Sequence, residues 1–366
     1  MNTSVVRQER ASSIDFRPDL LSLRRRMLSL SQTELADAAG ISQGTLSKIE
    51  QGLKEVTAPQ IEVLARALNC PISFFTQKAR EYGSPMSMHD GMFRKSASVG
   101  QKVIDRVIAE LNVRIAHTST LLSMVEVEPE LPLPSYDIED YEGDLEVIAK
   151  NVRRAWLMPR GPVKNLTEYL ERAGCIIIKC NMNGAKIDGV SYRITNLPPL
   201  IFINNALPAD RERFTLAHEL GHIVLHRYPV PDMENEANKF ASALLMPAAD
   251  IAPDLQNLTI ERAAALKPYW KVSMAALIYK AKSLGVIDEG KSQYLWRTMS
   301  TRGYRTREPE SLNFANEQTS IFDALIKNIQ EDLNYSEGEL AAVLHLHFEE
   351  LNSMYRIKKL PFLRSI

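Results

Sequence analysis

Hydrophobic residues recur every three or four positions along most of the chain, which is the spacing of one buried helix face. Short patterns of this kind run from Pro18 to Phe75, with Gly, Ser and Pro between them and no strand-like alternation. A longer apolar stripe at Val103, Val107 and Leu111 predicts one extended helix. Helical spacing returns from Asp210 onward, so we expect a mainly α-helical protein.

Three short apolar segments in the middle of the chain predict strands, because turn residues separate them. They are CIIIKC, GVSYRI and LIFINN, and helices are expected before them at about 144–156 and 165–172. Together they predict a small sheet. LIFINN is either an edge strand along which an extended peptide lies or an ordinary inner strand, and the pattern leaves both open.

The remaining segments predict connectors and further helices. Residues 126–146 contain nine acidic residues and no Lys or Arg, which indicates a solvated connector. The stretch Ser320–Tyr355 predicts two helices, separated near Tyr335 and Gly338. We expect the stripe at 103–115 to pack on its own domain, although the same pattern also fits a homodimer.

Composition limits the class of protein. At 366 residues the chain is long enough for two or three domains, and a net charge of −1 means that any DNA affinity must come from a local patch. No apolar run approaches the ~20 residues of a membrane span, and the N-terminus lacks the apolar core of a signal peptide. With three cysteines, a cytoplasmic protein is expected, without membrane contact, and any metal must be held by His and carboxylates.

The segment SQTELADAAGISQGTLSKIEQG, from Ser31 to Gly52, has the order of a helix-turn-helix. Ser31 and Ser42 are suited to cap two successive helices, and Gly40 permits the turn between them. The expected inward positions of the two helices and their turn are Leu35, Ala39, Ile41, Leu46 and Ile49.

The outer face of the second helix holds groups that reach base edges or phosphates, and the whole segment resembles the Xre or phage-repressor type over about residues 18–76. The resemblance implies that Gln32 contacts the DNA backbone and that Arg24, Arg25 and Arg26 add phosphate contacts. A protein-interaction domain of the same fold is the alternative, because residues 1–80 hold only 11 basic against 8 acidic residues. The expected DNA-binding residues are Gln32, Ser42, Gln43, Gly44, Ser47 and Lys48.

A second motif, HELGH at 218–222, lies within a helical pattern and matches HExxH. Residues four apart project from the same side of a helix, so His218 and His222 can converge on one Zn²⁺. Glu219 then lies beside the metal, where its carboxylate can take a proton from a water molecule. Apolar neighbours on the same helix make two buried histidines without a ligand costly.

A catalytic zinc has three protein ligands, so a third must be found. Tyr228 stands where a metzincin has its third histidine, and His226 is too far along the helix to join both imidazoles. A following helix supplies Glu234 and Glu236. We favour Glu234, because it shares a face with small residues and with Asn238, which would orient a ligand histidine by a hydrogen bond without binding the metal itself.

The two motifs, RFTLAHELGHIVLH and ENEANKFASALLMP, resemble the ImmA/IrrE metallopeptidase family, including members fused to an N-terminal Xre-type domain. The similarity covers roughly residues 144–285. It implies a zinc-dependent peptidase that cleaves helix-turn-helix repressors and so releases mobile-element, stress or defence genes, including toxin–antitoxin systems.

We therefore expect a multidomain fold, mainly α with a small β-sheet: an all-α helix-turn-helix domain, an α+β gluzincin-like metallopeptidase domain and a helical C-terminal region. The expected function is a DNA-binding regulator that cleaves a protein substrate. The alternative is a repressor or antitoxin whose zinc site is structural or sensory. The expected segments are a disordered N-terminus (1–16), the helix-turn-helix domain (17–80), a linker (81–143), the peptidase domain (144–300) and the C-terminal region (301–366).

Overall fold

The computed structural model describes residues 15–78, 80–83, 100–182 and 184–355. Two predictions lie almost entirely outside the described residues: the disordered N-terminus, and the linker stretch rich in Gly, Ser and Met. The chain forms two compact units, each described here by itself. Unit 1 comprises residues 1–81, 101–120 and 330–366, and unit 2 comprises residues 82–100 and 121–329. The domain bounds expected from the sequence stay predictions.

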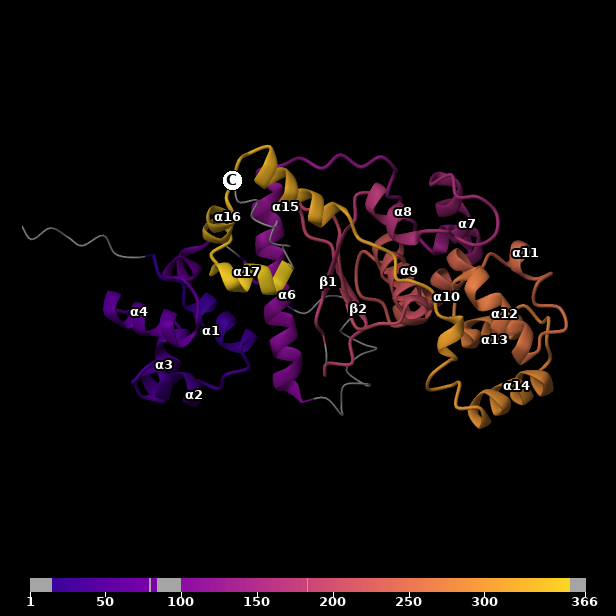
Figure 1. The fold of residues 1–366 in the computed structure, drawn as a ribbon, viewed down its shortest axis with the longest axis horizontal. Coiled ribbons are helices and arrows are strands. Elements are labelled where there is room, and N and C mark those ends of the chain that lie inside the picture. Colours follow the sequence, from indigo (N-terminus) through magenta and orange to yellow (C-terminus); the bar gives the residue numbers. More distant parts are fainter. Residues whose placement is uncertain (1–14, 79, 84–99, 183, 356–366) are drawn as a thin grey trace, which may run out of the picture. The chain divides into compact units, whose positions relative to one another are not determined.

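Unit 1 is entirely helical in its described part, as the apolar spacing predicts (Figure 1). Its first five helices are short, and α6 is the long helix expected from the stripe. The elements are α1 (Pro18–Met27), α2 (Gln32–Ala38), α3 (Gln43–Glu50), α4 (Ala58–Ala67), η1 (Ile72–Thr76), α6 (Gln101–Leu122), α16 (Glu337–Val343) and α17 (Phe348–Tyr355).

The core of unit 1 joins segments from both ends of the chain. Leu35, Leu46 and Ile49 are fully buried between α2 and α3. Arg24 of α1 is 1% exposed; its Nη2 lies 2.9 Å from Glu350 Oε2 in α17 and also donates to the carbonyl of Asn69 at 2.7 Å. A buried charge is tolerated only when it is paired, so this ion pair ties the C-terminal helix to the first helix.

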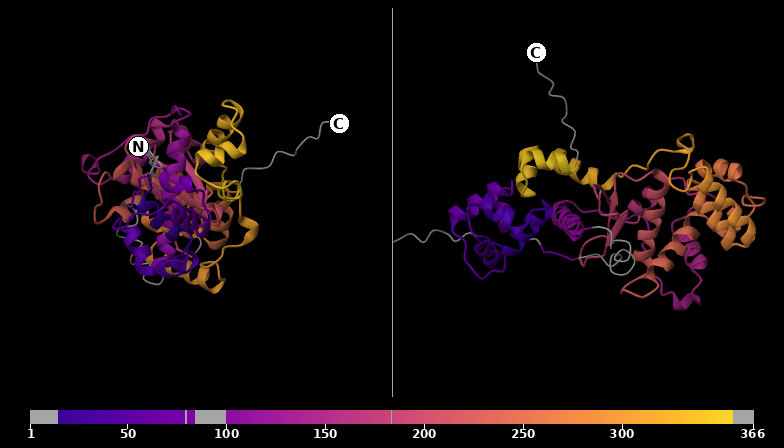
Figure 2. Two further views of the ribbon diagram at one scale, coloured as in Figure 1. Left: turned by 90° about the vertical axis from the view of Figure 1, so that its left-hand side faces the viewer. Right: turned by 90° about the horizontal axis from the view of Figure 1, so that it is seen from below.

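Unit 2 contains a small sheet and the remaining helices, and the predicted fold class is confirmed. In Figures 1 and 2, helices α12 to α14 lie together at one end of this unit, away from the sheet. The elements are η3 (Glu139–Tyr141), α7 (Leu145–Ala155), α8 (Leu166–Arg172), β1 (Ile176–Cys180), β2 (Gly189–Tyr192), β3 (Leu200–Asn204), α9 (Ala209–Leu225), α10 (Met233–Leu245), α11 (Ala248–Ile251), α12 (Ile260–Trp270), α13 (Met274–Ser283), α14 (Glu289–Thr301), η4 (Glu310–Leu312) and α15 (Ile321–Glu331).

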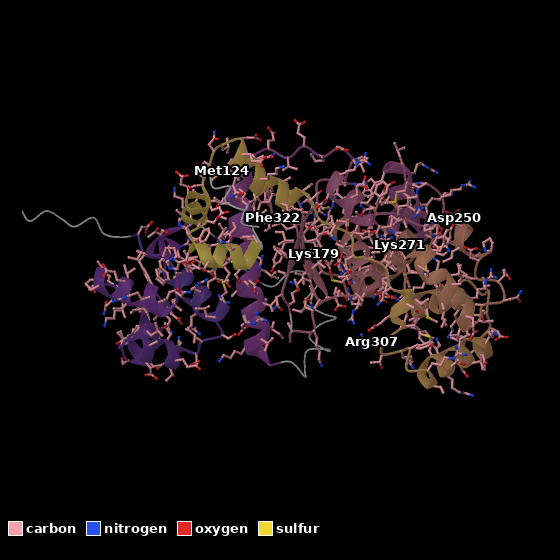
Figure 3. The ribbon with its side chains drawn as sticks, viewed as in Figure 1. Met124, Lys179, Asp250, Lys271, Arg307 and Phe322 are labelled. Carbon is pink, nitrogen blue, oxygen red and sulfur yellow. The ribbon has the colours of Figure 1, made fainter. Side chains whose placement is uncertain are left out.

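The sheet has the strand order β1-β3-β2, with β1 parallel and β2 antiparallel to β3. The LIFINN segment forms β3 and is therefore the central strand, so the possibility that it is an edge strand was wrong. The physical reason is that β3 is paired on both sides and buried throughout, so it has no free edge for a peptide. Lys179 of β1 lies at the sheet, whereas Asp250 and Lys271 lie among the helices (Figure 3).

Two expectations about connecting segments need correction. The C-terminal stretch forms three helices, α15, α16 and α17, because the chain turns again after Val343, where His345 has a positive φ of 54°. The acidic connector is not solvated throughout. Most of its charged residues are exposed, but Glu146 pairs with the buried Lys280. Leu131 joins the core of unit 2, and the amide of Tyr136 donates to the carbonyl of Val224 at 2.8 Å.

His117 of α6 is a buried titratable group in unit 1. Its ring is 1% exposed, and its Nδ1 lies 2.7 Å from the hydroxyl of Tyr355 in α17. Burial, together with the neighbouring Arg114 guanidinium, lowers the pKa of His117 from 6.5 to about 3. The folded protein therefore holds this imidazole neutral at pH values where the unfolded chain takes up a proton.

The stability of the protein should fall as pH is lowered from 8 to 5, because only the unfolded state protonates His117 in this range. The loss attributable to this residue is about 2 kcal/mol, and His117→Gln should lack it. Urea unfolding followed by circular dichroism at both pH values measures this difference, with the exposed His347→Gln as control. Equal pH dependence in wild type and His117→Gln would contradict a neutral buried His117.

Candidate functional site

The HExxH segment lies in α9, a 17-residue helix that begins after Pro208 and ends at Leu225. Its buried face packs on the sheet and on α10, and most residues from Thr215 to Leu225 are buried. Within this face, Glu219 is 2% exposed and His222 is 5% exposed. Polar groups at such depth need specific partners, and α10 and the sheet supply them.

The approach of α10 to α9 is unusually close because of one glycine. A Cβ placed on Gly221 would lie 3.1 Å from the Cα of Ala237 and 3.2 Å from Cδ1 of Phe240. These distances are shorter than ordinary van der Waals contact, and the first of them is to backbone. Gly221 on α9 and the small Ala237 on α10 therefore allow the polar residues of the two helices to meet.

Three side chains converge where the helices meet. Nε2 of His218 and Nε2 of His222 lie 3.0 Å apart, and Glu234 Oε1 lies 3.2 Å from the Nε2 of His222. The second oxygen of Glu234 lies 3.6 Å from the Nε2 of His218. One ligand atom from each residue lies within 4.8 Å of the other two. The structure thus brings together the two histidines and the glutamate favoured as the third ligand.

Asn238 lies beside this cluster, one helical turn after Glu234. Its Oδ1 is 3.1 Å from the Nδ1 of His218. Burial lowers the pKa of the His218 imidazole, while the Glu219 carboxylate beside it raises that pKa; the net direction is downward. A neutral imidazole whose Nδ1–H donates to an amide oxygen has a free lone pair on Nε2, which is the form that ligates a metal.

Glu219 has a partner on the sheet that the sequence analysis did not identify. The hydroxyl of Ser191, on β2, donates to Oε2 of Glu219 at 2.7 Å, and Ser191 is itself buried. The contact fixes the carboxylate and leaves Oε1 for another group. Ser191 is a single polar residue in a short strand, β2. Side chains alternate between the two faces of a strand, and the placing of Ser191 on the face toward α9 is the one signal in the sequence that would have indicated this role.

Two further groups lie behind His222. Its Nδ1 is 3.1 Å from the Nδ1 of His226, and the Nε2 of His226 is 3.0 Å from Oε2 of Glu236. Glu236, the alternative third ligand, therefore contacts His226 and is not among the three converging side chains. The identity of the third ligand stays a prediction.

In unit 1, the helix-turn-helix segment has the predicted local structure. Ser31 and Glu34 form a capping box at the start of α2, and Ser42 accepts from the amide of Thr45 at the start of α3. Gly40 has a φ of +64°, a conformation that favours glycine, in the turn between them. The expected reading residues on α3 are exposed or half-buried, and they are Gln43, Gly44, Ser47 and Lys48.

A hydrogen-bonded network fixes the first of these residues. Glu50, which is 6% exposed, accepts from Arg25 Nε at 2.6 Å and from Gln32 Nε2 at 2.8 Å. The side-chain oxygen of Gln32, Oε1, accepts from Gln43 Nε2 at 2.7 Å. Because each donor and acceptor in this network is assigned in turn, the network fixes the orientation of the exposed Gln43 side-chain amide.

Of the three consecutive arginines of α1, Arg24 is buried and cannot make the expected phosphate contact, whereas for Arg25 and Arg26 this contact stays a prediction. Arg24 is buried with Glu350, Arg25 pairs with Glu50, and the Nη2 of Arg26 lies 2.7 Å from Glu81 Oε1. Each of these carboxylates offsets the charge of its guanidinium partner, and the pair of Arg26 with Glu81 is partly exposed. The basic excess counted in the sequence therefore overstates the positive charge available to DNA.

Two family models match separate parts of this chain. Residues 21–75 match a model described as helix-turn-helix, and residues 170–282 match Peptidase_M78, described as the IrrE N-terminal-like domain. The first match runs from within α1 to within η1, and the second contains β1 to β3, α9 and α10. The chain therefore combines a helix-turn-helix DNA-binding regulator domain with a metallopeptidase-type domain.

Similar curated proteins support the first assignment. Over 59 residues the chain is 37% identical to an uncharacterized HTH-type transcriptional regulator of Sinorhizobium medicae, and equally to one of Rhizobium meliloti. The aligned part is 16% of this chain and 42% of each relative, so the chain spans less than half the length of these regulators. In the part of the chain that the structure describes, no helix is long and apolar enough to cross a membrane.

Replacing Gly221 by alanine should destabilise unit 2 by about 1 to 3 kcal/mol, because the added methyl group overlaps the backbone of α10. Thermal or urea unfolding measures the loss. The control is Gly290→Ala in α14, where a Cβ meets only Asp288 Oδ1 at 3.6 Å. Similar effects of the two substitutions would show that the close approach at Gly221 is not a packing constraint.

Proposed function

We propose that this protein, which joins a helix-turn-helix domain to a Peptidase_M78 domain, is a transcriptional regulator with zinc-dependent peptidase activity of the gluzincin type. His218, His222 and Glu234 hold the metal, and Glu219 acts as the general base. The observation that supports the proposal most is the convergence of three ligand atoms beside a carboxylate that Ser191 holds in place.

The donor set and its spacing fit zinc. Two imidazole nitrogens and one carboxylate oxygen are ligands that zinc takes in catalytic sites. Tetrahedral bonds of about 2.0 to 2.1 Å separate neighbouring ligand atoms by roughly 3.3 Å. The separations of 3.0, 3.2 and 3.6 Å lie around this value. Among the described residues three protein ligands converge, so a zinc ion bound in tetrahedral geometry would keep one position for water or substrate.

The residues around the site have separate roles in peptide hydrolysis. When bound, zinc supplies Lewis acidity to a water molecule and to the carbonyl oxygen of the scissile peptide. Oε1 of Glu219 accepts a proton from the attacking water, while its Oε2 stays fixed by the Ser191 hydroxyl. The same carboxylic acid then donates this proton to the leaving nitrogen. Asn238 keeps the His218 ring oriented.

The substrate class follows from the resemblance to ImmA/IrrE peptidases. We propose that the protein cleaves a helix-turn-helix repressor or a related regulator in a stress, mobile-element or defence response, including toxin–antitoxin systems. The alternative is a repressor or antitoxin whose zinc is structural or sensory. A structural site needs no general base beside an open metal position, so the buried Glu219 favours hydrolysis.

The DNA-binding part of the proposal rests on α3. Gln43, oriented by Gln32 and Glu50, faces base edges, and Lys48 contacts base or phosphate. Ser42, Gly44 and Ser47 lie along the same side of the helix. Domains of this type bind paired half-sites as dimers, so a homodimer on a DNA operator is part of the proposal.

The substitution Glu219→Gln should preserve zinc and abolish proteolysis, because an amide cannot accept the proton of the attacking water. Elemental analysis should find about one zinc per chain in wild type and in this variant, but none in His218→Ala. Mass spectrometry of new protein N-termini in cells expressing each form would identify the cleaved regulator. Glu289→Gln, which changes an exposed carboxylate of α14, is the control.

Cleavage by Glu219→Gln at the wild-type rate would remove Glu219 from the mechanism. Stoichiometric zinc without any new N-termini in wild type would instead favour the structural or sensory alternative. Zinc retained in His218→Ala would show that the converging residues are not the metal ligands.

On operator DNA selected from random sequence, Gln43→Ala should reduce discrimination at particular base pairs by about 1 to 3 kcal/mol. Lys48→Ala should weaken binding and lower the salt slope by about one if Lys48 contacts phosphate. Binding isotherms at several salt concentrations measure both effects. The control is Gln256→Ala, which changes an exposed glutamine of unit 2. If neither substitution on α3 matters, the protein-interaction alternative replaces DNA binding.

A further inference from the structure

We propose that His226 and Glu236 are positioning residues for the metal centre. They form a hydrogen-bonded relay, in the order His222, His226, Glu236, that fixes the tautomer and the ring orientation of His222. This inference rests on the proposed metal-binding function, and it gives a role to two residues that are not ligands.

The relay is continuous and lies largely inside the protein. The Nδ1 atoms of His222 and His226 are 3.1 Å apart, and the Nε2 of His226 is 3.0 Å from Oε2 of Glu236. The side chains of His222 and His226 are 5% and 2% exposed, whereas that of Glu236 is 21% exposed. The carboxylate thus ends the relay near solvent, where its charge is tolerated.

Ligation of His222 determines every proton in the relay. The Nε2 of His222 faces His218 and Glu234, so this nitrogen donates its lone pair to the metal. A neutral imidazole then has its proton on Nδ1, and this N–H must find an acceptor. The Nδ1 of His226 is the group at hydrogen-bonding distance. His226 therefore has its own proton on Nε2, and this N–H donates to the carboxylate of Glu236.

The geometry separates this role from direct ligation. His226 contacts the Nδ1 edge of the His222 ring, whereas the cluster lies at the Nε2 edge. Both nitrogens of His226 are within hydrogen-bonding distance of the relay partners. A metal held at the cluster is thus on the far side of His222 from His226. The same contact holds Glu236 away from the cluster.

The two ligand histidines are supported in equivalent ways. The Nδ1 of His218 faces the amide oxygen of Asn238, and the Nδ1 of His222 faces the unprotonated nitrogen of His226. Each ligand has an acceptor behind it that makes its Nε2 a better donor to the metal. His222, the more buried ligand, is supported through a second histidine, His226. The carboxylate that completes this support, that of Glu236, lies farther away.

Competition between the full-length protein and a zinc chelator tests the relay. His226→Phe removes the acceptor while preserving ring volume, and it should weaken zinc affinity about 10- to 100-fold. His226→Asn should restore most of the affinity, because its Oδ1 takes the place of the imidazole Nδ1. Glu236→Ala should weaken zinc binding less than His226→Phe does. Lys239→Ala, an exposed change on α10, should leave it unchanged.

Two further measurements distinguish positioning from simple packing. The zinc-free variants should unfold within a few degrees of wild type, whereas the rise in Tm on adding zinc should shrink in His226→Phe and recover in His226→Asn. In zinc-loaded protein labelled with ¹⁵N-histidine, the Nδ1–H proton of His222 should exchange slowly with solvent and should lose this protection in His226→Phe. If His226→Phe does not fold, the smaller change Glu236→Ala still reports on the relay.

Zinc affinity within twofold of wild type in folded His226→Phe would overturn the proposal. Equal weakening of zinc affinity in His226→Asn and His226→Phe would also overturn the proposal, because it would show that the hydrogen-bond acceptor at position 226 does not determine the affinity. A wild-type protein that binds no zinc would contradict both this inference and the proposed function. A protein whose zinc affinity depends on the relay as expected, but which cleaves no regulator, would contradict the proposed function alone.

Discussion

The close contact between α9 and α10 is the constraint on which the candidate metal centre depends. A side chain at position 221 has no room, because the backbone of Ala237 lies within 3.1 Å of where its Cβ would be. With glycine on one helix and alanine on the other, Glu234 reaches the two histidines of α9. Wider helix spacing would separate the carboxylate of Glu234 from the two imidazoles, and a buried polar group without a partner costs about 1 to 3 kcal/mol.

Hydrogen-bonding partners on neighbouring elements support the polar groups at this contact, which is why Glu219 and His222 can be buried. Ser191 on the sheet holds Glu219, Asn238 holds His218, and His226 with Glu236 supports His222. The supporting groups come from a strand and from both helices. A buried network of this kind is stabilising only when every member has a partner, so it also restricts the relative positions of those elements.

Unit 1 also depends on polar groups that pair inside the protein, in this case ion pairs. Arg24 is almost fully enclosed, and its carboxylate partner, Glu350, is more than three hundred residues away in the chain. Removing one partner of such a pair costs about 3 to 5 kcal/mol, because the other charge stays buried. The pair between Arg25 and Glu50 extends through Gln32 to Gln43, so the orientation of a proposed DNA-reading side chain depends on an ion pair inside the domain.

Local sequence determined the features that depend on neighbouring residues. Capping by Ser31 and Ser42, the turn at Gly40 and the pairing of two histidines four residues apart all follow from backbone geometry within a few positions. Apolar spacing likewise predicted the long α6 and the three strands. Features that join distant segments could not be derived in this way. The tertiary structure alone decided that β3 is central, that Arg24 is buried and that Ser191 and His226 support the site, because each depends on which surfaces pack together.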